Sequence, residues 1–411
     1  MKEVAIIGVG MHQCGRFMEK GLKELGCVAT WNAIHDANID ARDIGAAYVS
    51  NGLAGLITGQ EGIRGQIILG HAGISGIPIV NVEGACASGV IALREAAIAV
   101  GAGVCDVALA LGVEKMYSGN TSIAIKAISS DADIDTGSSM GLQFTALYAM
   151  NLRKLMDKYG WTQEDFAMVT VKNKYHGSLN PNAQFQTPVT IEEVLNSRLI
   201  ADPLTLLMCS AIGDGAAAAI VCSKEVAHKY ARKPLVTIEA TQLRTPSFRD
   251  PRHKIDVVQK SPPYLQEGLP YKDLYAQADV AREAYERAGI GPEDIEVAEV
   301  HDAMSPAEMM RCVALGFYKA EDAPAWIREG CSSLTGKLPV NPSGGLGARG
   351  HPIGATGLAQ VSEMVWQLRG EAGQRQVPGR GGKGPKVALI QNSGGYGPSG
   401  TAALTVTILK R

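Results

Sequence analysis

The fold is decided by the stretch Ile77-Pro-Ile-Val-Asn-Val-Glu-Gly-Ala-Cys-Ala-Ser-Gly-Val-Ile-Ala-Leu-Arg-Glu-Ala-Ala-Ile-Ala-Val100. Its β-branched run over residues 77–82 predicts a short buried strand, and Gly84 and Gly89 flank a turn. From residue 87 onward nearly every side chain is small or aliphatic. A helix that is apolar on almost all sides must be buried, so the stretch predicts a strand, a tight turn and a core helix.

Cys86 falls at the predicted start of this helix. The first turn of a helix presents unpaired N–H groups and the positive end of the helix dipole, which lower the pKa of a thiol. A thiolate is a strong nucleophile and its common use is acyl transfer. The same position also suits a small buried core residue, and this stretch alone leaves both interpretations open.

Length and composition exclude several classes of protein. A chain of 411 residues makes two domains or one large duplicated unit. The net charge of −2 carries no basic excess for nucleic acid, and no uninterrupted apolar run is long enough to span a bilayer. The eight cysteines show no metal-ligand spacing, and the N-terminus lacks the apolar core of a signal peptide. We therefore expect reduced thiols, no metal site and a cytoplasmic location.

An internal repeat indicates a duplicated α/β unit. Residues 29–51 resemble 280–302, each predicting an amphipathic helix, a capped turn and a strand, with Ser50 in register with His301. Residues 106–114 resemble 386–394, and residues 215–224 resemble 400–409. Three matches in the same order predict two similar halves of layered α/β structure.

The region between Gly119 and Pro203 contains none of the repeated segments, so we interpret it as an inserted loop domain. The predicted organisation is an N-terminal half over 1–118 completed by 204–232, an insertion over 119–203 and a C-terminal half over 233–411. An insertion of this size usually covers a site or forms an interface. Within the second half, residues 241–271 are predicted to be irregular.

Two histidines and a glycine cluster join Cys86 as candidate site residues. His301 follows a predicted strand, His351 lies in the glycine-rich segment 341–357, and Gly394 follows another predicted strand. Strand ends are where α/β proteins build their sites. A single histidine at a strand end is more often structural, and a glycine-rich turn is often only a turn. The conjunction of all four residues in a duplicated chain favours a site.

These motifs resemble those of the thiolase superfamily over nearly the whole chain. The segment 81–89 is similar to the family's nucleophilic cysteine motif, and Gly350-His-Pro-Ile-Gly-Ala-Thr-Gly357 is similar to its GHPxGxTG motif. The His-Asp pair at 301–302 resembles the branch of sterol-carrier-protein and archaeal thiolases. The resemblance implies a five-layered αβαβα fold, acyl-CoA and CoA as substrates with no permanently bound cofactor, and a dimer or tetramer. It also implies that the loop domain covers a coenzyme A tunnel.

Carried onto this chain, the resemblance assigns four roles. Cys86 becomes acylated, His351 takes its proton, His301 contacts the substrate oxyanion, and the backbone N–H groups of Cys86 and Gly394 form a second oxyanion hole. One departure concerns the second catalytic cysteine that many thiolases carry in a Cys-x-Gly motif. Here that place is Asn392, and Ala303 stands where the sterol-carrier branch can carry cysteine. Asn392 cannot shuttle a proton near neutral pH, so we expect His301 to do so.

The expected function is CoA-dependent cleavage, or the reverse Claisen formation, of a β-ketoacyl-CoA, with a specialised substrate such as 2-benzoylsuccinyl-CoA left open. Members of this branch often work with a small zinc-ribbon/OB-fold companion subunit, which this chain does not contain. The alternatives are a β-ketoacyl-synthase-like enzyme, another acyltransferase or retro-aldolase, and a non-catalytic subunit whose partner carries out the chemistry.

Overall fold

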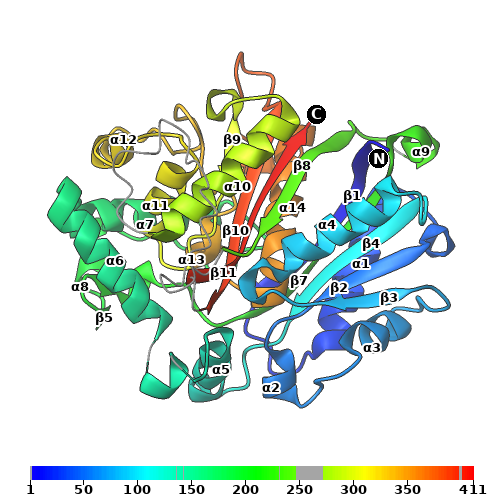
Figure 1. Cartoon of the computed structure of the whole chain (residues 1–411), viewed down its shortest axis with the longest axis horizontal. Coiled ribbons are helices and arrows are strands. Elements are labelled where there is room, and N and C mark those ends of the chain that lie inside the picture. The colour runs from blue at the N-terminus through cyan, green and yellow to red at the C-terminus, as the bar shows by residue number, and fades with distance from the viewer. Residues whose placement is uncertain (1, 136, 142, 231, 247–271, 398–399) are drawn as a thin grey trace, which may run out of the picture.

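The computed structural model describes residues 2–135, 137–141, 143–230, 232–246, 272–397 and 400–411 (Figure 1). Its strands are β1 (Val4–Gly15), β2 (Ala46–Ser50), β3 (Ile79–Val82), β4 (Val107–Glu114), β5 (Leu199–Ala201), β6 (Leu204–Thr205), β7 (Asp214–Ser223), β8 (Val236–Arg244), β9 (Val297–Glu299), β10 (Val387–Gly397) and β11 (Gly400–Lys410). Its α-helices are α1 (Leu22–Ala37), α2 (Ala54–Thr58), α3 (Arg64–His71), α4 (Ser88–Gly101), α5 (Thr121–Ile128), α6 (Phe144–Tyr159), α7 (Gln163–Ser178), α8 (Ile191–Asn196), α9 (Lys224–Tyr230), α10 (Lys272–Ala288), α11 (Ala307–Ala314), α12 (Ala323–Arg328), α13 (Gly345–Ala348) and α14 (Ile353–Arg369).

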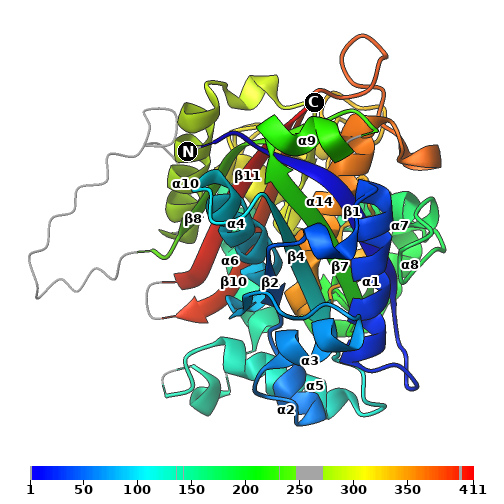
Figure 2. The same ribbon diagram turned by 90° about the vertical axis from the view of Figure 1, so that its right-hand side faces the viewer.

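The main strands run in the order β3-β2-β4-β7-β1-β8-β11-β10-β9 as one nine-stranded sheet within the described residues. The two halves meet where β1 pairs antiparallel with β8, and each half repeats the other's strand directions on either side of that seam. Helices α4 and α14 lie between the two halves of the sheet, α1 and α3 cover the outer face of the first half, and α10 covers that of the second (Figures 1 and 2). This gives the expected five layers.

Period-two alternation along the strands sorts side chains between the layers. In β4 the side chains of Ala108 and Ala110 face α4 and α14, whereas Leu109 and Leu111 face the outer helix α1. β7 repeats the pattern, and its inner face is also rich in alanine. Small side chains on the inner faces let the central helices approach both halves of the sheet closely.

Helices α4 and α14 touch backbone to backbone through glycine. A Cβ atom added to Gly89 would lie 2.8 Å from the nitrogen of Leu358, and one added to Gly357 would lie 2.5 Å from the nitrogen of Val90. No side chain fits at either position, because the neighbouring atoms are backbone. The starts of the two helices are therefore held side by side, and the predicted site residues Cys86 and His351 lie two residues before those starts.

The strand registers test the predicted repeat. Tyr48 pairs with Ala110 in the first half, and Glu299 pairs with Ile390 in the second, which confirms the alignment that places Ser50 on His301. The third match is wrong in register. Ala110 pairs with Ala219 and Ile390 with Thr407, so β11 is shifted by three residues from the sequence match. Runs of alanine, valine and threonine look alike at several offsets, which explains the error.

Two other local predictions need correction. The strand over 77–82 was expected to be buried, but β3 is the edge strand, with β2 as its neighbour, and Val80 is 46% exposed. The irregular stretch 241–271 begins later than expected, because β8 continues to Arg244. The remainder of that stretch from residue 247 lies outside the described residues.

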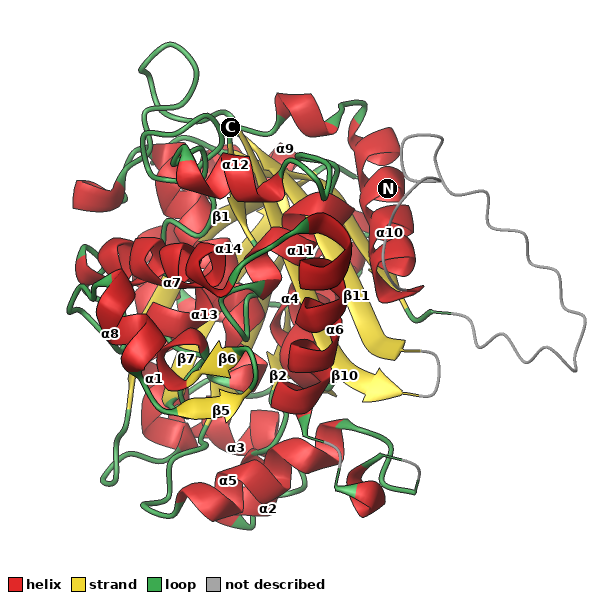
Figure 3. Cartoon of the chain, turned by 90° about the vertical axis from the view of Figure 1, so that its left-hand side faces the viewer, coloured by secondary structure: helices red, strands yellow, loops and turns green. Residues whose placement is uncertain are grey.

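Residues 119–203 form α5 to α8 and β5 to one side of the sheet (Figures 1 and 3). Helix α7 begins at a Thr162 cap, where the Thr162 hydroxyl accepts from the nitrogen of Asp165 and the Asp165 carboxylate accepts from the nitrogen of Thr162. The apolar core of this region also includes side chains of α11 and α12, such as Met309 and Ile327. Among the described helices, none is long and apolar enough to cross a membrane.

Candidate active site

Cys86 lies in a tight turn between β3 and α4. The turn is a 3-10 segment over Ala85–Ala87, so the cysteine precedes the helix instead of occupying its first turn. Ala85 adopts a left-handed conformation with φ of 49°, which is unusual for a residue with a side chain. The Ser88 hydroxyl holds this conformation, because it donates to the oxygen of Ala85 at 2.6 Å and accepts from the nitrogen of Gly84 at 2.9 Å. Such strain at a nucleophile is typical of functional sites.

The end of β10 packs directly on this turn at Gly394. A Cβ atom added to Gly394 would lie 2.1 Å from the oxygen of Gly84, 2.7 Å from the nitrogen of Ala87 and 2.9 Å from the nitrogen of Cys86. Only glycine allows this contact, since every neighbour is a backbone atom. The structure thus brings the predicted pair Cys86 and Gly394 together through their main chains.

His351 lies two residues before α14, and a hydrogen bond to a residue in the first turn of that helix fixes the orientation of its ring. Its Nδ1 lies 2.7 Å from the hydroxyl of Thr356. That hydroxyl donates its own hydrogen to the oxygen of Pro352 at 3.0 Å, so it must accept from Nδ1. The proton is therefore on Nδ1, and Nε2 keeps a lone pair available to Cys86.

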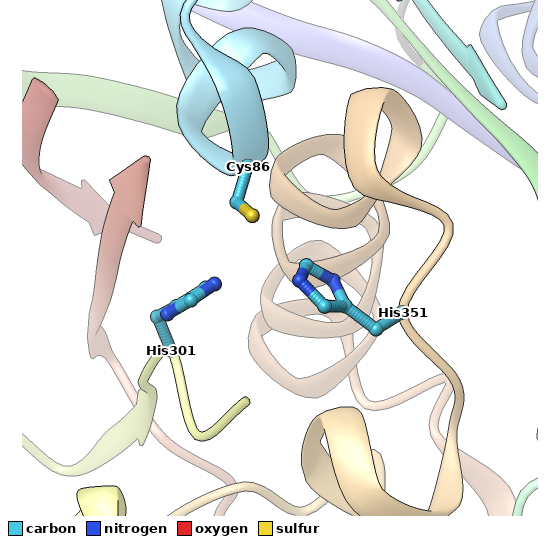
Figure 4. A group of neighbouring side chains, drawn as sticks. All are labelled: Cys86, His301 and His351. Atoms are coloured by element: carbon cyan, nitrogen blue, oxygen red, sulfur yellow. The ribbon is translucent and has the colours of Figure 1, made fainter. Parts of the chain in front are cut away.

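His301 completes the group from the loop that follows β9. Its backbone nitrogen donates to the side chain of Gln391 at 3.0 Å, and neither ring nitrogen has a hydrogen-bond partner among the described residues. The ring meets that of His351 edge to face, with centroids 5.2 Å apart. One side-chain atom each of Cys86, His301 and His351 lie within 4.8 Å of one another, and the sulfur points between the two rings (Figure 4).

Electrostatics leave this group uncharged at rest. Burial, followed by repulsion from Asp131 and Glu114, raises the pKa of the Cys86 thiol well above its usual value. Burial likewise lowers the pKa of His351 to about 3 and that of His301 well below its usual value. The predicted lowering of the thiol pKa is therefore wrong, because desolvation outweighs the nearby helix. Cys86 must pass its proton to a base as it attacks, and Nε2 of His351 is placed to receive it.

Cys86, His301, His351 and Gly394 all line one cavity of about 320 Å³. Most of its wall is apolar, and α5, α6 and the strand β5 contribute part of it, with side chains such as Ile125, Phe144 and Ile200. The other ionisable side chains on the wall are Asp131, Tyr148, Cys209, Arg311 and Tyr396. The cavity has the size and lining of a site for an acyl chain.

The sequence analysis assigned no role to three polar residues near the site: Glu114, Thr356 and Asp131. Glu114, at the end of β4, accepts hydrogen bonds from the nitrogens of Gly52, Leu53 and Gly354, and so ties both halves of the chain together. Thr356 was quoted within a motif without a role. Asp131 lies in a small polar loop without any motif. The sequence did contain a signal for Glu114, because it is a single acidic residue at the end of an otherwise apolar predicted strand.

Asn392, which the sequence motifs align with a second catalytic cysteine, is fully buried. Its side-chain nitrogen donates to Gln360 at 2.7 Å, and its oxygen accepts from the nitrogen of Ser393. The side-chain amide of Asn392 is thus hydrogen-bonded within the protein, and Asn392 is not among the described residues that line the cavity.

Cys86, His301 and His351 also have the donor types that Zn²⁺ prefers. A metal there would occupy the nucleophile and block the thiol chemistry.

Two family models match the chain: the thiolase N-terminal domain over residues 4–225 and the thiolase C-terminal domain-like family over residues 271–410. The chain belongs to the thiolase family. An acetyl-CoA acetyltransferase of Methanothermobacter thermautotrophicus is 41% identical over 99% of both chains. The benzoylsuccinyl-CoA thiolase subunit BbsB of Thauera aromatica is 36% identical over 96% of this chain and 95% of its own.

Among solved structures, the Ltp2-ChsH2(DUF35) aldolase superposes with a TM-score of 0.77 at 23% identity, covering 98% of this chain and 97% of that chain. This likeness confirms the fold. Together with the family models, the full-length relatives identify the protein as an acyltransferase of the thiolase family.

Proposed function

We propose that the protein cleaves a β-ketoacyl-CoA with coenzyme A, or forms one in reverse, through an acyl group carried on Cys86. The observation that carries this proposal is the convergence of the Cys86 sulfur with ring nitrogens of His301 and His351 within 4.8 Å, at the wall of an apolar cavity. A thiol beside a neutral imidazole whose tautomer is fixed is an acyl-transfer pair.

In the first half-reaction, Cys86 attacks the β-keto carbon of the substrate while Nε2 of His351 takes the thiol proton. The oxyanion that develops faces His301, whose ring nitrogens lack other hydrogen-bond partners among the described residues. In the second half-reaction, CoA attacks the acyl-Cys86 thioester. The N–H groups of Cys86 and Gly394, brought together by the close packing of β10, would bind that oxyanion. Each such donor is worth roughly 3 kcal/mol of barrier.

Arg311 supports a specific substrate class. Its side chain is 4% exposed and lines the acyl cavity beside Tyr148, so a cation stands in a largely apolar wall. A guanidinium in such a place favours an acyl group that carries a carboxylate. 2-Benzoylsuccinyl-CoA has both a free carboxylate and an aromatic ring for the apolar wall. We propose a substrate of this class ahead of unsubstituted acetoacetyl-CoA.

Acyl-CoA profiling tests both levels of the proposal. Purified protein is incubated with CoA and a series of β-ketoacyl-CoAs with and without a carboxylate, and Cys86 is followed by mass spectrometry. We expect a Cys86 adduct and ping-pong kinetics, with neither in Cys86→Ala. The variant Arg311→Met should lose the carboxylated substrates preferentially. Absence of thiolysis with every substrate would refute the activity, whereas equal losses in Arg311→Met would refute only the substrate class.

We also propose a small companion subunit and assembly into a dimer or tetramer. The relative BbsB is named as a subunit, and the Ltp2 structure contains the partner ChsH2(DUF35). Affinity purification of the tagged chain from its host, followed by mass measurement of the intact assembly, tests this. A chain that elutes alone as a monomer with full thiolase activity would contradict it.

A further inference from the structure

The proposed reaction needs a second proton-transfer group. When the carbon–carbon bond of the substrate breaks, the α-carbon of the leaving CoA thioester must gain a proton, and in the reverse direction it must lose one. His351 is already engaged with the Cys86 proton, and Asn392 is buried with its amide bonded to Gln360. The following inference rests on the proposed thiolase function and concerns which residue handles this second proton.

Asp131 is held at the catalytic wall by main-chain contacts. It ends the 3-10 segment Ser129–Asp131, and the next residue, Ala132, forms a β-bridge with Tyr396 at the end of β10. The nitrogen of Asp133 donates to the oxygen of Tyr396 at 3.2 Å. A Cβ atom added to Gly395 would lie 3.2 Å from the oxygen of Asp131. The strand that supplies Gly394 therefore also fixes Asp131, and both Asp131 and Cys86 line the cavity.

The surroundings of Asp131 favour its protonated form. Burial, then repulsion from Glu114 at the end of β4 and Glu83 before the Cys86 turn, raises the pKa of this carboxyl to about 8. Among carboxylates, Asp131 has the largest effect on the thiol of Cys86. A proton on Asp131 removes that repulsion. A carboxyl that can hold or release a proton near neutral pH is suited to acid–base catalysis.

Two other side chains on the cavity wall are weaker candidates. Burial and the neighbouring His351 lower the pKa of His301 well below its usual range, so this ring is neutral, and its N–H already faces the substrate oxyanion. Cys209 donates its thiol hydrogen to the oxygen of Thr205 at 3.4 Å, and burial raises its pKa to about 11. His301 is thus committed to the oxyanion, and the thiol of Cys209 is committed to the oxygen of Thr205.

We propose that Asp131 is the catalytic residue that gives a proton to, and takes one from, the α-carbon of the CoA thioester, in the role for which this chain lacks a second cysteine. In thiolysis, Cys86 attacks the keto carbon as His351 takes the thiol proton. The bond between the keto carbon and the α-carbon breaks, and its electron pair takes the proton of the Asp131 carboxyl. The proton held by His351 then passes through solvent to the Asp131 carboxylate, and CoA gives its thiol proton to His351 as it attacks the acyl-Cys86 thioester. The Cys86 sulfur leaves and recovers its proton from His351.

Two measurements on the same variants separate this step from acylation. The first is the rate of Cys86 acylation by acetyl-CoA, followed by mass spectrometry. The second is incorporation of deuterium from D₂O into the methyl group of acetyl-CoA. In Asp131→Asn we expect acylation within threefold of wild type and deuterium incorporation lowered by about 100-fold or more. Asp131→Glu should recover part of the incorporation. Asp135→Asn, an exposed acid in the same loop, serves as the matched control.

The pH profile adds a readout that a structural role would not move. Because Asp131 must act as a base to remove the methyl proton, wild-type incorporation should rise as pH increases through about 8. This rise of deuterium incorporation with pH should be absent in Asp131→Asn. The proposal is overturned if incorporation and acylation fall in parallel, if neither falls, or if Cys209→Ser and not Asp131→Asn loses incorporation selectively. Failure of the wild-type protein to become acylated by any of the acyl-CoAs tested would instead refute the proposed thiolase activity.

Discussion

Replacing Gly394 with alanine should disable the nucleophile without touching any side chain of the site. The added Cβ would lie 2.1 Å from the oxygen of Gly84 and 2.9 Å from the nitrogen of Cys86. Ordinary contacts to carbon begin near 3.4 Å, so β10 and the cysteine turn must separate by about 1 Å. A displacement of that size costs about 100-fold in rate, and overpacking in a buried strand costs about 1–3 kcal/mol of stability.

The assay is the rate of Cys86 acylation by acetyl-CoA, measured on intact protein together with the urea midpoint of unfolding. Gly397→Ala provides the matched control, because it lies in the same strand and an added Cβ has no atom within 4 Å among the described residues. We expect the control to match wild type in both measurements. Wild-type acylation and stability in Gly394→Ala would refute the view that this backbone contact positions Cys86.

Two further predictions concern buried side chains that hold the site residues or their neighbours in place. Thr356→Val removes the acceptor that fixes the tautomer of His351, and loss of one hydrogen bond of about 1.4 kcal/mol should slow Cys86 acylation about tenfold, as measured by rapid-quench mass spectrometry. Arg349→Met removes the buried partner of Glu299, whose ion pair is 3.1 Å long, and should lower the free energy of unfolding in urea by about 3–5 kcal/mol at pH 8.5.

Controls for both variants are available in the chain. Thr356→Ser keeps the hydroxyl and should retain the acylation rate, so equal rates in the Val and Ser variants would contradict the tautomer argument. Burial raises the pKa of Glu299 to about 7 even with Arg349 present, and without Arg349 it should rise further. Stability of Arg349→Met should therefore fall as pH increases from 6 to 8.5, because the folded state then holds a proton that the unfolded state releases. Arg42→Met, at an exposed ion pair, keeps Arg349 and should show only the wild-type fall in stability, which ends above about pH 7.

Much of the site follows from sequence because backbone patterns place it. Strand-then-turn signals put Cys86, His301 and Gly394 at strand ends, and parallel strands of one sheet end on the same side. The repeat predicts that Ser50 and His301 occupy equivalent places in the two halves, as the strand pairing confirms. These inferences depend on periodicity and chain order, which a sequence records directly.

The remaining features depend on three-dimensional surroundings. The pKa of Cys86 is raised by burial and by Asp131 and Glu114, which are distant in sequence, whereas the local pattern suggested only the effect of the helix. The edge position of β3 depends on strand order, and the same β-branched run would suit a central strand. Asp131 reaches the site through a β-bridge to Tyr396, a contact between segments more than 200 residues apart that leaves no motif.

The glycine contact between α4 and α14 has a consequence for how this protein could diversify. Cys86 and His351 each precede one of these helices, and the helices meet through backbone atoms at Gly89 and Gly357. The distance between the nucleophile and the base is thus set by the main-chain contact between α4 and α14. Part of the acyl-cavity wall comes from α5, α6 and β5, which lie in the region 119–203 and not on these two helices. Natural variation can reshape the substrate wall while the reacting pair keeps its geometry.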